Sequence, residues 1–401
     1  MTPKAFRAAL LGAFLALTTG AEAAYETPAS HALLVDYETG AIMVEKNADE
    51  LMPPESMSKM MTAYLVFKTL KDERLRLTDQ LPVSQKAWRM GGSKMFVMVG
   101  TRVGVEDLLR GMIIQSGNDA CIVLAEGISG SEERFVEEMN RLARQIGVTK
   151  SVFRNTTGWP DPEHLATARD LATIARRIVA DFPEYYHFYS EIDFTYGKDA
   201  KGKDIRQGNR NPLLYKNIGV DGLKTGHTDA SGYGLTFSGL REGRRVIGVI
   251  NGMKTMNARS QEAERLFDHA YAEFTNARLF AKGETVDDAQ VWLGQRPDVP
   301  LVVEDAVTVT LTRKARREMK VRLIYDGPVA APVVKGQPIG KIEITAPGFE
   351  TVERRVVAGA DVDRLGMPQR LFAAFNHLLY GSSAGAAPQQ AQKGARLNRG
   401  S

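Results

Sequence analysis

The sequence predicts an α+β domain followed by a small all-β domain. Strand patterns lie near both ends of the segment 24–282 and helical patterns fill its middle, which is the order expected of an α+β core. Beyond Gly283 the pattern changes to short alternating runs separated by glycine and proline. The chain has 401 residues, 43% of them hydrophobic, which is enough for two folded domains.

The N-terminus has the pattern of a secretory signal peptide. Lys4 and Arg7 precede the apolar run 8–17, and Ala21-Glu22-Ala23 follows as an A-x-A cleavage site. The run is about half of the roughly 20 apolar residues that span a bilayer, which argues against a membrane anchor. We therefore expect residues 1–23 to be removed and the mature protein to be exported.

The first folded elements are a hairpin and a buried helix. Residues 32–46 form two apolar runs on either side of the turn signal Glu38-Thr39-Gly40, the pattern of a hairpin. From Ser56 to Leu70, apolar residues recur at helical spacing on nearly every face. A helix of that kind is expected in the core.

Helical patterns then continue to residue 179, where the chain returns to strands. Thr167 is the expected N-cap of the last of these helices. Two adjacent strands and a covering helix are predicted after residue 230. The predicted helices are Val105–Gln115, Asn118–Glu126, Glu132–Ile146, Ala168–Val179 and Arg259–Phe274, and the strands are Tyr233–Ser238 and Arg244–Ile250.

The remainder divides into three parts. Residues 283–362 are predicted to form a small β-sandwich. Pro368–Tyr380, within the segment 363–380, has an apolar stripe at helical spacing and is too short to span a bilayer. It is suited either to lying in a membrane interface or to packing on the β domain. Residues 381–401 are small and polar, and we expect them to be disordered.

Charge and composition exclude several classes of function. Lys and Arg number 52 against 48 Asp and Glu, and a net charge of +4 does not indicate nucleic-acid binding. The six histidines are scattered without the spacing of a metal site, so we predict no metal and no cofactor. Cys121 is the only cysteine; its apolar neighbours predict a buried side chain, and it cannot form an intrachain disulfide.

Three short motifs carry the chemistry: Ser56-Met57-Ser58-Lys59, Ser116-Gly117-Asn118 and Lys224-Thr225-Gly226. By average composition, a chain of this length contains about one or two S-x-x-K strings and about one S-x-N by chance. K-T-G is rarer. All three in this order on an exported chain are characteristic of class A β-lactamases and penicillin-binding proteins.

The first motif has the composition of an activated nucleophile. Residues three apart on a helix share a face, so the Lys59 amine is expected near the Ser56 hydroxyl, where it can act as a base. Burial and the positive charge of Lys224 would favour the neutral amine. At a helix N-terminus, the Ser56 N–H is free to bind an oxyanion. The alternative is a buried serine beside a surface lysine.

The other two motifs offer groups suited to binding and proton transfer. The Ser116 hydroxyl can relay a proton and the Asn118 carboxamide can hold a substrate amide, although both residues also suit helix capping. Lys224 and Thr225 offer a cation and a hydroxyl to a carboxylate, and Gly226 lets a substrate backbone lie against the strand. An exposed strand end is the alternative there.

Together the segments 54–62, 116–121 and 220–228 resemble the serine D-Ala-D-Ala carboxypeptidases among the low-molecular-mass penicillin-binding proteins. The resemblance spans nearly the whole chain and implies a penicillin-binding, β-lactamase-like fold with an antiparallel sheet and a helical cluster. It adds Arg210 as a ligand of the substrate carboxylate and the His227 N–H as part of the oxyanion hole.

The resemblance also implies the reaction and the location. The substrate is a peptidoglycan stem peptide ending in D-Ala-D-Ala, which acylates Ser56 with loss of the last D-Ala and is then hydrolysed. A β-lactam would stop at the acyl stage as a covalent inhibitor. The expected location is periplasmic, attached peripherally to the outer face of the inner membrane through the C-terminal amphipathic helix.

Three rival functions remain at this point. A DD-endopeptidase uses the same nucleophile on cross-linked stems. A serine β-lactamase would need a carboxylate such as Glu163 to activate the deacylating water. A catalytically idle wall-binding or shape protein need not retain Ser56, Lys59 and Lys224 together. A nucleotide-binding P-loop is rejected, because Leu223 separates Gly222 from Lys224 and breaks the pattern.

Overall fold

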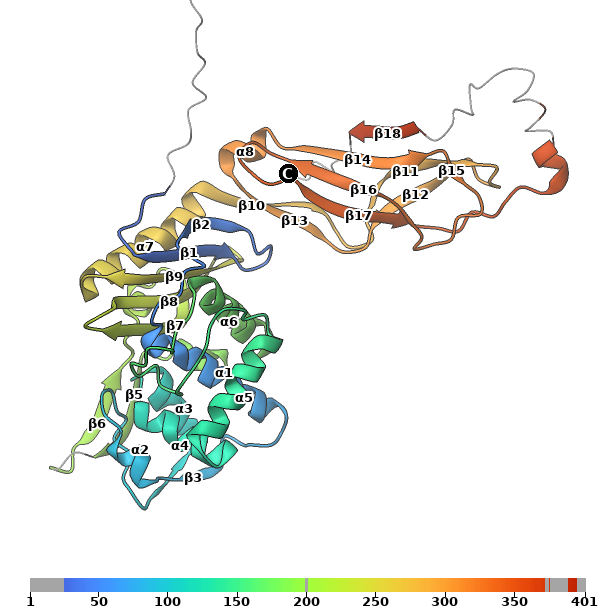
Figure 1. Cartoon of the computed structure of the whole chain (residues 1–401). Helices are drawn as coiled ribbons and strands as arrows, with labels where there is room; N and C mark the ends of the chain where they lie inside the picture. Colours follow the sequence, from blue (N-terminus) through green and yellow to red (C-terminus); the bar gives the residue numbers. More distant parts are fainter. Residues whose placement is uncertain (1–24, 199–200, 372–374, 376–388, 395–401) are drawn as a thin grey trace, which may run out of the picture.

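A computed structural model describes residues 25–198, 201–371, 375 and 389–394. It has two parts, a mixed helix-and-sheet domain and an elongated all-β domain that extends away from it (Figure 1). The predicted signal peptide, residues 1–23, lies outside the described residues. No helix within the described ranges has the length and apolar character needed to cross a membrane.

A five-stranded antiparallel sheet organises the first domain. Its strand order is β2-β1-β9-β8-β7, so β7 is an outer strand. The predicted hairpin and the predicted strand pair after residue 230 are both confirmed. The strands are β1 (His31–Asp36), β2 (Ile42–Lys46), β7 (Val220–Thr228), β8 (Gly232–Arg241) and β9 (Arg244–Met253).

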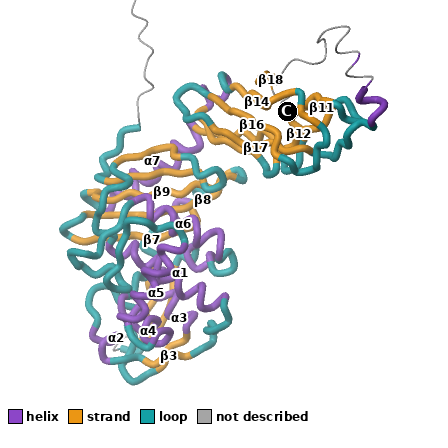
Figure 2. Tube along the Cα trace, turned by 45° about the vertical axis from the view of Figure 1, so that its right-hand side comes forward, coloured by secondary structure: helices purple, strands orange, loops and turns teal. Residues whose placement is uncertain are grey.

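Helices cover both faces of this sheet. Helix α7 (Met256–Glu273) packs on one face, where Phe267 meets Phe237 of β8 edge-on. The other face carries α6 (Ala168–Asp181) and, beyond it, the rest of the helical cluster, as Figures 1 and 2 show. The sheet is therefore buried on both sides, and only its edges and ends are open to a ligand.

The helical cluster follows the predicted order. Helix α1 is buried on nearly all faces, as its continuous apolar pattern predicts. The Thr167 hydroxyl caps α6 by accepting from the Asp170 N–H at 3.0 Å, so the predicted N-cap is confirmed. The helices are η1 (Glu55–Ser58), α1 (Lys59–Lys71), α2 (Gln85–Arg89), α3 (Val105–Ile113), α4 (Asn118–Ser129) and α5 (Glu132–Gln145).

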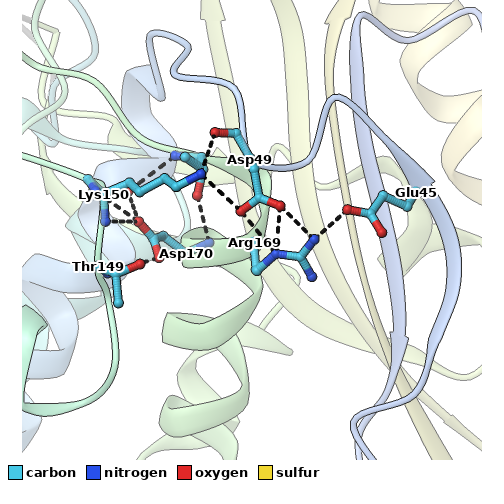
Figure 3. Close-up of polar contacts among 8 residues, drawn as sticks. Glu45, Asp49, Thr149, Lys150, Arg169 and Asp170 are labelled. Atoms are coloured by element: carbon cyan, nitrogen blue, oxygen red, sulfur yellow. Dashed lines mark hydrogen bonds and ion pairs between the residues drawn. The ribbon is translucent and has the colours of Figure 1, made fainter. Parts of the chain in front are cut away.

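Polar contacts around the start of α6 fix two loops (Figure 3). The buried Asp170 carboxylate accepts from the N–H groups of Thr149, Lys150 and Ser151 at 2.8 to 3.1 Å. The adjacent Arg169 guanidinium binds Asp49 at 2.8 Å. A buried carboxylate with three backbone donors holds residues 149–151 firmly. The loop 152–165 follows directly from these residues.

Short elements complete the first domain. They are β3 (Gln80–Pro82), β4 (Arg102–Gly104), η2 (Tyr186–Tyr189), β5 (Asp193–Lys198), β6 (Asp204–Gly208) and η3 (Pro212–Lys216). Strands β3 and β4 pair with each other, and so do β5 and β6.

The second domain is all-β, as predicted, with its own hydrophobic core. A seven-stranded sheet has the order β15-β11-β12-β17-β16-β14-β18, and β10 pairs separately with β13. Its elements are β10 (Phe274–Phe280), β11 (Thr285–Trp292), β12 (Asp298–Val303), β13 (Val307–Thr312), α8 (Arg313–Arg317), β14 (Lys320–Gly327), β15 (Val329–Ala330), β16 (Pro338–Thr345) and β17 (Val352–Ala358).

The structure differs from the predicted division of the chain at residue 282. Strand β10 follows α7 directly and pairs with β13, so Phe274–Phe280 belongs to the second domain. The short alternating runs that set the predicted boundary begin only after Gly283, so β10 falls on the other side of that boundary. Contacts between the domains include the Thr39 and Thr310 hydroxyls, 2.6 Å apart.

The C-terminal expectations are only partly within the described residues. Residues 367–371 and 375 are helical, and most of the predicted helix Pro368–Tyr380 lies outside the described residues. The prediction of disorder over 381–401 was wrong for β18 (Gln389–Gly394), which pairs antiparallel with β14. Without β18, the backbone groups of β14 would form an unpaired sheet edge.

Candidate active site

Ser56 lies on η1, a 3-10 helix of one turn, directly before α1. The turn packs against β7 and β8, where Gly226 and Gly234 stand opposite each other on the two strands. A Cβ on Gly226 would lie 2.2 Å from Glu55 Oε2, and one on Gly234 would lie 2.6 Å from Met57 Cε. Because these two paired glycines have no side chains, the turn with Ser56 can pack closely on the sheet.

Lys59 points at Ser56 from the first turn of α1. Its Nζ lies 2.8 Å from Ser56 Oγ, 2.8 Å from Asn118 Oδ1 and 2.6 Å from the Thr157 carbonyl oxygen. The side chain is 1% exposed. Burial is the main cause that lowers the pKa of Lys59 to about 8; the Arg210 charge acts in the same direction, and Cys121 and Asp119 act in the opposite one.

These three contacts fit a neutral amine that faces a serine hydroxyl. A neutral lysine has two N–H donors and one lone pair, while an ammonium has three donors. The Asn118 and Thr157 oxygens can only accept, so they take the two donors. The lone pair is left for the Ser56 O–H, which is the arrangement in which a base removes that proton.

The two functional residues of the second motif, Asn118 and Ser116, differ in their contacts with Lys59. Asn118 begins α4, is 6% exposed, and spans the cleft: its Oδ1 meets Lys59 and its Nδ2 donates to the Gly91 carbonyl at 2.8 Å. Ser116 is buried just before it, with φ of 66°. Within the described residues its hydroxyl makes no side-chain hydrogen bond, so Ser116 is not linked directly to Ser56 or Lys59.

Asp119 holds the facing loop in place. Its carboxylate is fully buried and accepts from the N–H groups of Met95, Phe96 and Val97 at 2.9, 2.9 and 3.2 Å. The Asn118 N–H donates to the Ser93 carbonyl at 2.7 Å. Residues 93–97 are thus tied to the start of α4, which places Asn118 firmly beside Lys59.

The third motif lies on β7, the outer strand. Lys224 is 2% exposed, and its Nζ donates to the Thr225 carbonyl at 3.1 Å. Burial, followed by the charges of Lys59 and Arg210, lowers the pKa of Lys224 well below its ordinary value. Two buried lysines whose positive charges repel each other cannot both be protonated at low cost. Lys59 has three oxygen partners and Lys224 has one, so the two amines differ in their hydrogen bonding.

His227 ends this motif with an exposed side chain, stacked on Tyr233 at 3.9 Å between ring centroids. Because β7 has no strand on its outer side among the described residues, alternate backbone N–H and C=O groups along that side have no sheet partner. Such groups are what a bound peptide backbone requires.

Arg210 and Arg259 form the cationic end of the site. Arg210 is exposed to solvent, yet the protein atoms around its guanidinium lower its pKa. Its charge lowers the pKa values of Lys59 and Lys224, which places it on their side of the sheet. Arg259, which the sequence analysis did not identify, is 4% exposed, and its guanidinium donates to the Arg210 carbonyl at 3.4 Å.

A loop that the sequence analysis did not include completes the site. Its ends are joined by the Val152–Leu165 bridge, and it supplies the Thr157 carbonyl to Lys59. The buried His164 fixes it to η1 through a 2.8 Å contact between Nε2 and Ser58 Oγ. The Arg154 N–H donates to His164 Nδ1 at 3.2 Å, so the proton resides on Nε2.

This loop also forms one wall of a cavity of about 580 Å³, which is lined by Glu55 but not by Ser56, Lys59 or Lys224. Glu55, Thr228 and Ser231 line the opposite wall, and Trp159 and Pro160 line the loop side. Burial lowers the pKa of His164 to about 4, so the imidazole is neutral at physiological pH. Thr157, Gly158 and His164 carried no motif in the sequence, because their partners are about a hundred residues away.

Cys121 and Glu163, two other residues singled out in the sequence, have different surroundings. Cys121 is buried, as predicted, and burial raises its thiol pKa to about 12. Glu163 is 71% exposed and pairs with Arg154 at 3.2 Å, so it is a solvated loop acid. In the described part of the chain, no three His, Cys, Asp or Glu side chains are grouped in a way that could hold a metal ion.

Two families match successive parts of the chain. Residues 18–255 match the family described as D-alanyl-D-alanine carboxypeptidase. Residues 274–364 match the C-terminal domain of penicillin-binding protein 5, beginning at the first residue of β10.

Characterised relatives are similar over most of their length. D-alanyl-D-alanine carboxypeptidase DacC of Escherichia coli is 36% identical over 91% of this chain and 92% of its own. DacF of Bacillus subtilis, of the same description, is 31% identical over 84% and 87%. The structure of penicillin binding protein 5 from Haemophilus influenzae matches with a TM-score of 0.76 and 36% identity, covering 85% of this chain and 99% of its own.

Proposed function

The chain belongs to the D-alanyl-D-alanine carboxypeptidase family and is a serine D-alanyl-D-alanine carboxypeptidase, and from this premise we propose that Ser56 is its nucleophile and Lys59 its general base. The observation that carries these assignments is the 2.8 Å contact between Lys59 Nζ and Ser56 Oγ, with the other two positions of the amine occupied by acceptors.

The acylation step follows from these positions. Ser56 Oγ attacks the carbonyl carbon of the penultimate D-Ala while its proton passes to Lys59 Nζ. The Ser56 N–H, free at a helix N-terminus, and the His227 N–H on the outer strand donate to the developing oxyanion. When the peptide bond breaks, Ser116 gives its proton to the leaving amine and takes up the proton held by Lys59, so the terminal D-Ala departs and Lys59 is neutral again.

The substrate is oriented by the groups around this centre. Lys224, Thr225 and Arg210 bind its terminal carboxylate, where the positive charges of the site are concentrated. Asn118 donates to a substrate amide from the opposite wall, and the backbone groups on the outer side of β7 pair with the substrate backbone. The space beside Gly226, which the sequence assigns to the substrate, is filled by Glu55 instead. Deacylation uses water in place of the leaving amine, with Lys59 again accepting the proton.

A Ser56→Ala variant tests the nucleophile. Wild-type protein should release D-Ala from a muramyl pentapeptide, and a fluorescent penicillin should form a long-lived adduct on Ser56, detectable by peptide mass spectrometry. Penicillin-binding protein D2 of Listeria monocytogenes, solved in an ampicillin-bound form, is 28% identical and supports this choice of probe. The Ser56→Ala variant should do neither. Ser58→Ala, on the same turn, is the matched control and should still be labelled on Ser56.

Rapid turnover of the penicillin to penicilloate would indicate a β-lactamase instead. The exposed position of Glu163, paired with Arg154, argues against that role, since it lacks the buried setting of a water-activating carboxylate. Binding of peptidoglycan without D-Ala release by the wild-type protein would support an idle scaffold. Product analysis on cross-linked dimers would measure any endopeptidase activity.

For location, we propose export to the periplasm and attachment to the membrane surface through 368–380. The described part of this segment supports attachment, because Leu371 and Phe375 are 68% and 60% exposed and do not pack on the β domain. A Leu371→Glu, Phe375→Glu double variant should leave vesicles of anionic lipid while keeping its carboxypeptidase rate. This design is preferable to truncation, which would also remove β18 from the sheet. Export predicts a mature N-terminus near Ala24.

A further inference from the structure

A buried carboxyl group immediately precedes the nucleophile. Glu55 is 2% exposed and has a φ of 48°, a left-handed backbone conformation that non-glycine residues rarely adopt. Neither carboxyl oxygen has a hydrogen-bond partner of normal geometry. Ser231 and Asn251 are close enough to stabilise the ionised form, but only through contacts that fall short of that geometry. A residue held this way in a cleft needs a functional explanation.

Glu55 is clamped between two glycines on opposite sides. A Cβ on Gly226 would lie 2.2 Å from Glu55 Oε2 and 3.1 Å from Glu55 Cβ, so the side chain lies flat on the β7 backbone. A Cβ on Gly158 would lie 1.7 Å from the Glu55 carbonyl oxygen, so the loop covers its main chain. The side chain of Glu55 therefore fills the space between η1 and the outer strand.

We propose that Glu55 is a positioning residue that sets the separation between the Ser56 N–H and the His227 N–H. Glu55 is bonded to Ser56, and its carboxyl rests on Gly226, the residue before His227. The side chain thus spans the two donors assigned to the oxyanion. This inference rests on the proposed roles of Ser56 and His227, and it adds a residue that acts through them.

The protonation state of this carboxyl matters because of where it lies. Burial raises the pKa of Glu55 to about 7, while Ser231, Asn251 and the Arg259 charge act in the opposite direction. A neutral carboxyl fills the space without adding charge. An ionised one places a negative charge beside the oxyanion, and like charges in a buried site repel strongly. Acylation should therefore be slowed as Glu55 ionises.

Several other ionisable groups face Glu55 from the elements around it. On α7, Arg259 is charged throughout the physiological range, with a pKa lowered by burial to about 10. Burial lowers the pKa values of His31 and His164, so both are neutral where Glu55 titrates. Lys59 titrates in the same range and must be separated by the design of the experiment. The remaining groups nearby are Lys224 and His227 on β7 and Asp161 in the loop.

The test is the rate of Ser56 acylation by a fluorescent penicillin, compared between the wild type and Glu55→Gln as pH rises. Glutamine keeps the size of the side chain but cannot ionise. Because both proteins contain Lys59, the ratio of their rates cancels its titration. The ratio of the Gln variant to the wild type should rise about tenfold between about pH 6 and about pH 8.5.

Two further variants separate filling space from ionisation. Glu55→Met keeps an unbranched side chain without charge, and its ratio to the wild type should rise with pH as that of Glu55→Gln does. Glu55→Ala leaves the space between η1 and β7 unfilled and should be acylated at least about tenfold more slowly than Glu55→Gln at every pH. Glu163→Gln makes the same change in an exposed carboxylate of the nearby loop, and its ratio to the wild type should not change with pH.

The outcomes are distinguishable from a failure of the proposed function. If the ratios for the Gln and Met variants stay constant with pH while Ser56 is still labelled, the role of the Glu55 carboxyl is overturned. The same follows if Glu55→Ala, shown to be folded by its thermal unfolding, acylates as fast as Glu55→Gln. Loss of Ser56 labelling in the wild type would instead contradict the proposed nucleophile.

Discussion

The two walls of the cleft are built differently. On the helical wall, the Lys59 amine is held by three oxygens from η1, α4 and the 152–165 loop. On the strand wall, the equally buried Lys224 amine donates only to the carbonyl of the next residue, within the described residues. Both lysines are nearly inaccessible to solvent, yet one is fully committed within the protein and the other is not.

This difference matches the two tasks of the site. A base must be held at one distance from the atom that it deprotonates, and errors of an ångström are costly. A group that binds substrate must instead keep donors free for the ligand. The helical wall is therefore complete before a substrate arrives, and the strand wall is completed by the substrate itself. The predictions below test that contrast, beginning with the largest expected effect.

Replacing Lys59 by methionine should nearly abolish acylation. The variant keeps an unbranched side chain of similar length but has no lone pair to take the Ser56 proton, so kcat/KM for D-Ala release should fall at least about 10³-fold. Thermal unfolding should show that the variant is folded, with a modest loss of stability, because the Asn118 and Thr157 oxygens lose their donor. A variant within tenfold of the wild type would refute the general-base assignment.

Replacing Lys224 by methionine should weaken substrate binding rather than remove the base. We expect kcat/KM to fall about a hundredfold on a peptide with a free C-terminal carboxylate. The effect should be much smaller on the same peptide with an amidated C-terminus, which presents no charge to the strand wall. Equal losses on both peptides would mean that Lys224 acts in catalysis and not in carboxylate binding.

The pH dependence should report the helical wall. Lys59, with a pKa of about 8, must be neutral to act as a base, so its active fraction rises with pH. Between about pH 5 and 6, where Glu55 is largely protonated, acylation should increase about tenfold per unit. A rate that is flat over this interval would show that the proton is removed by a group other than Lys59.

The smallest effect is expected from His164, in the loop that carries Thr157, and it concerns stability. His164 has a pKa of about 4 in the folded protein, below its ordinary 6.5. The unfolded chain therefore binds more protons, and the stabilisation present above pH 6.5 is lost as pH falls toward 4. The loss is at most about 3 kcal/mol. The free energy of unfolding, measured in urea at several pH values, should decrease over this pH range in the wild type but not in His164→Gln.

Local spacing was sufficient to predict one part of the site. Ser56 and Lys59 are three residues apart on one helical turn, so their contact follows from helix geometry. The Thr167 cap and the buried α1 follow from similarly local rules. The division between domains did not, because β10 precedes the short alternating runs after Gly283 that set the predicted boundary.

Contacts between distant segments were outside the reach of the sequence. Thr157 binds Lys59 across 98 positions, and the Ser58 to His164 contact spans 106. Gly158 carries no periodic signal, yet its left-handed φ of 76° and its close approach to the Glu55 carbonyl exclude a side chain. Glu55 looked like an ordinary residue before a motif, and only its burial between Gly158 and Gly226 distinguishes it.

The outer position of β7 has a further consequence for how the protein behaves among other proteins. An open strand edge is a site where unrelated chains can pair and aggregate. Among the described residues no strand covers the outer side of β7, so its backbone groups are open both to a substrate peptide and to another chain. A peptide bound along β7 would therefore also block self-association through this edge.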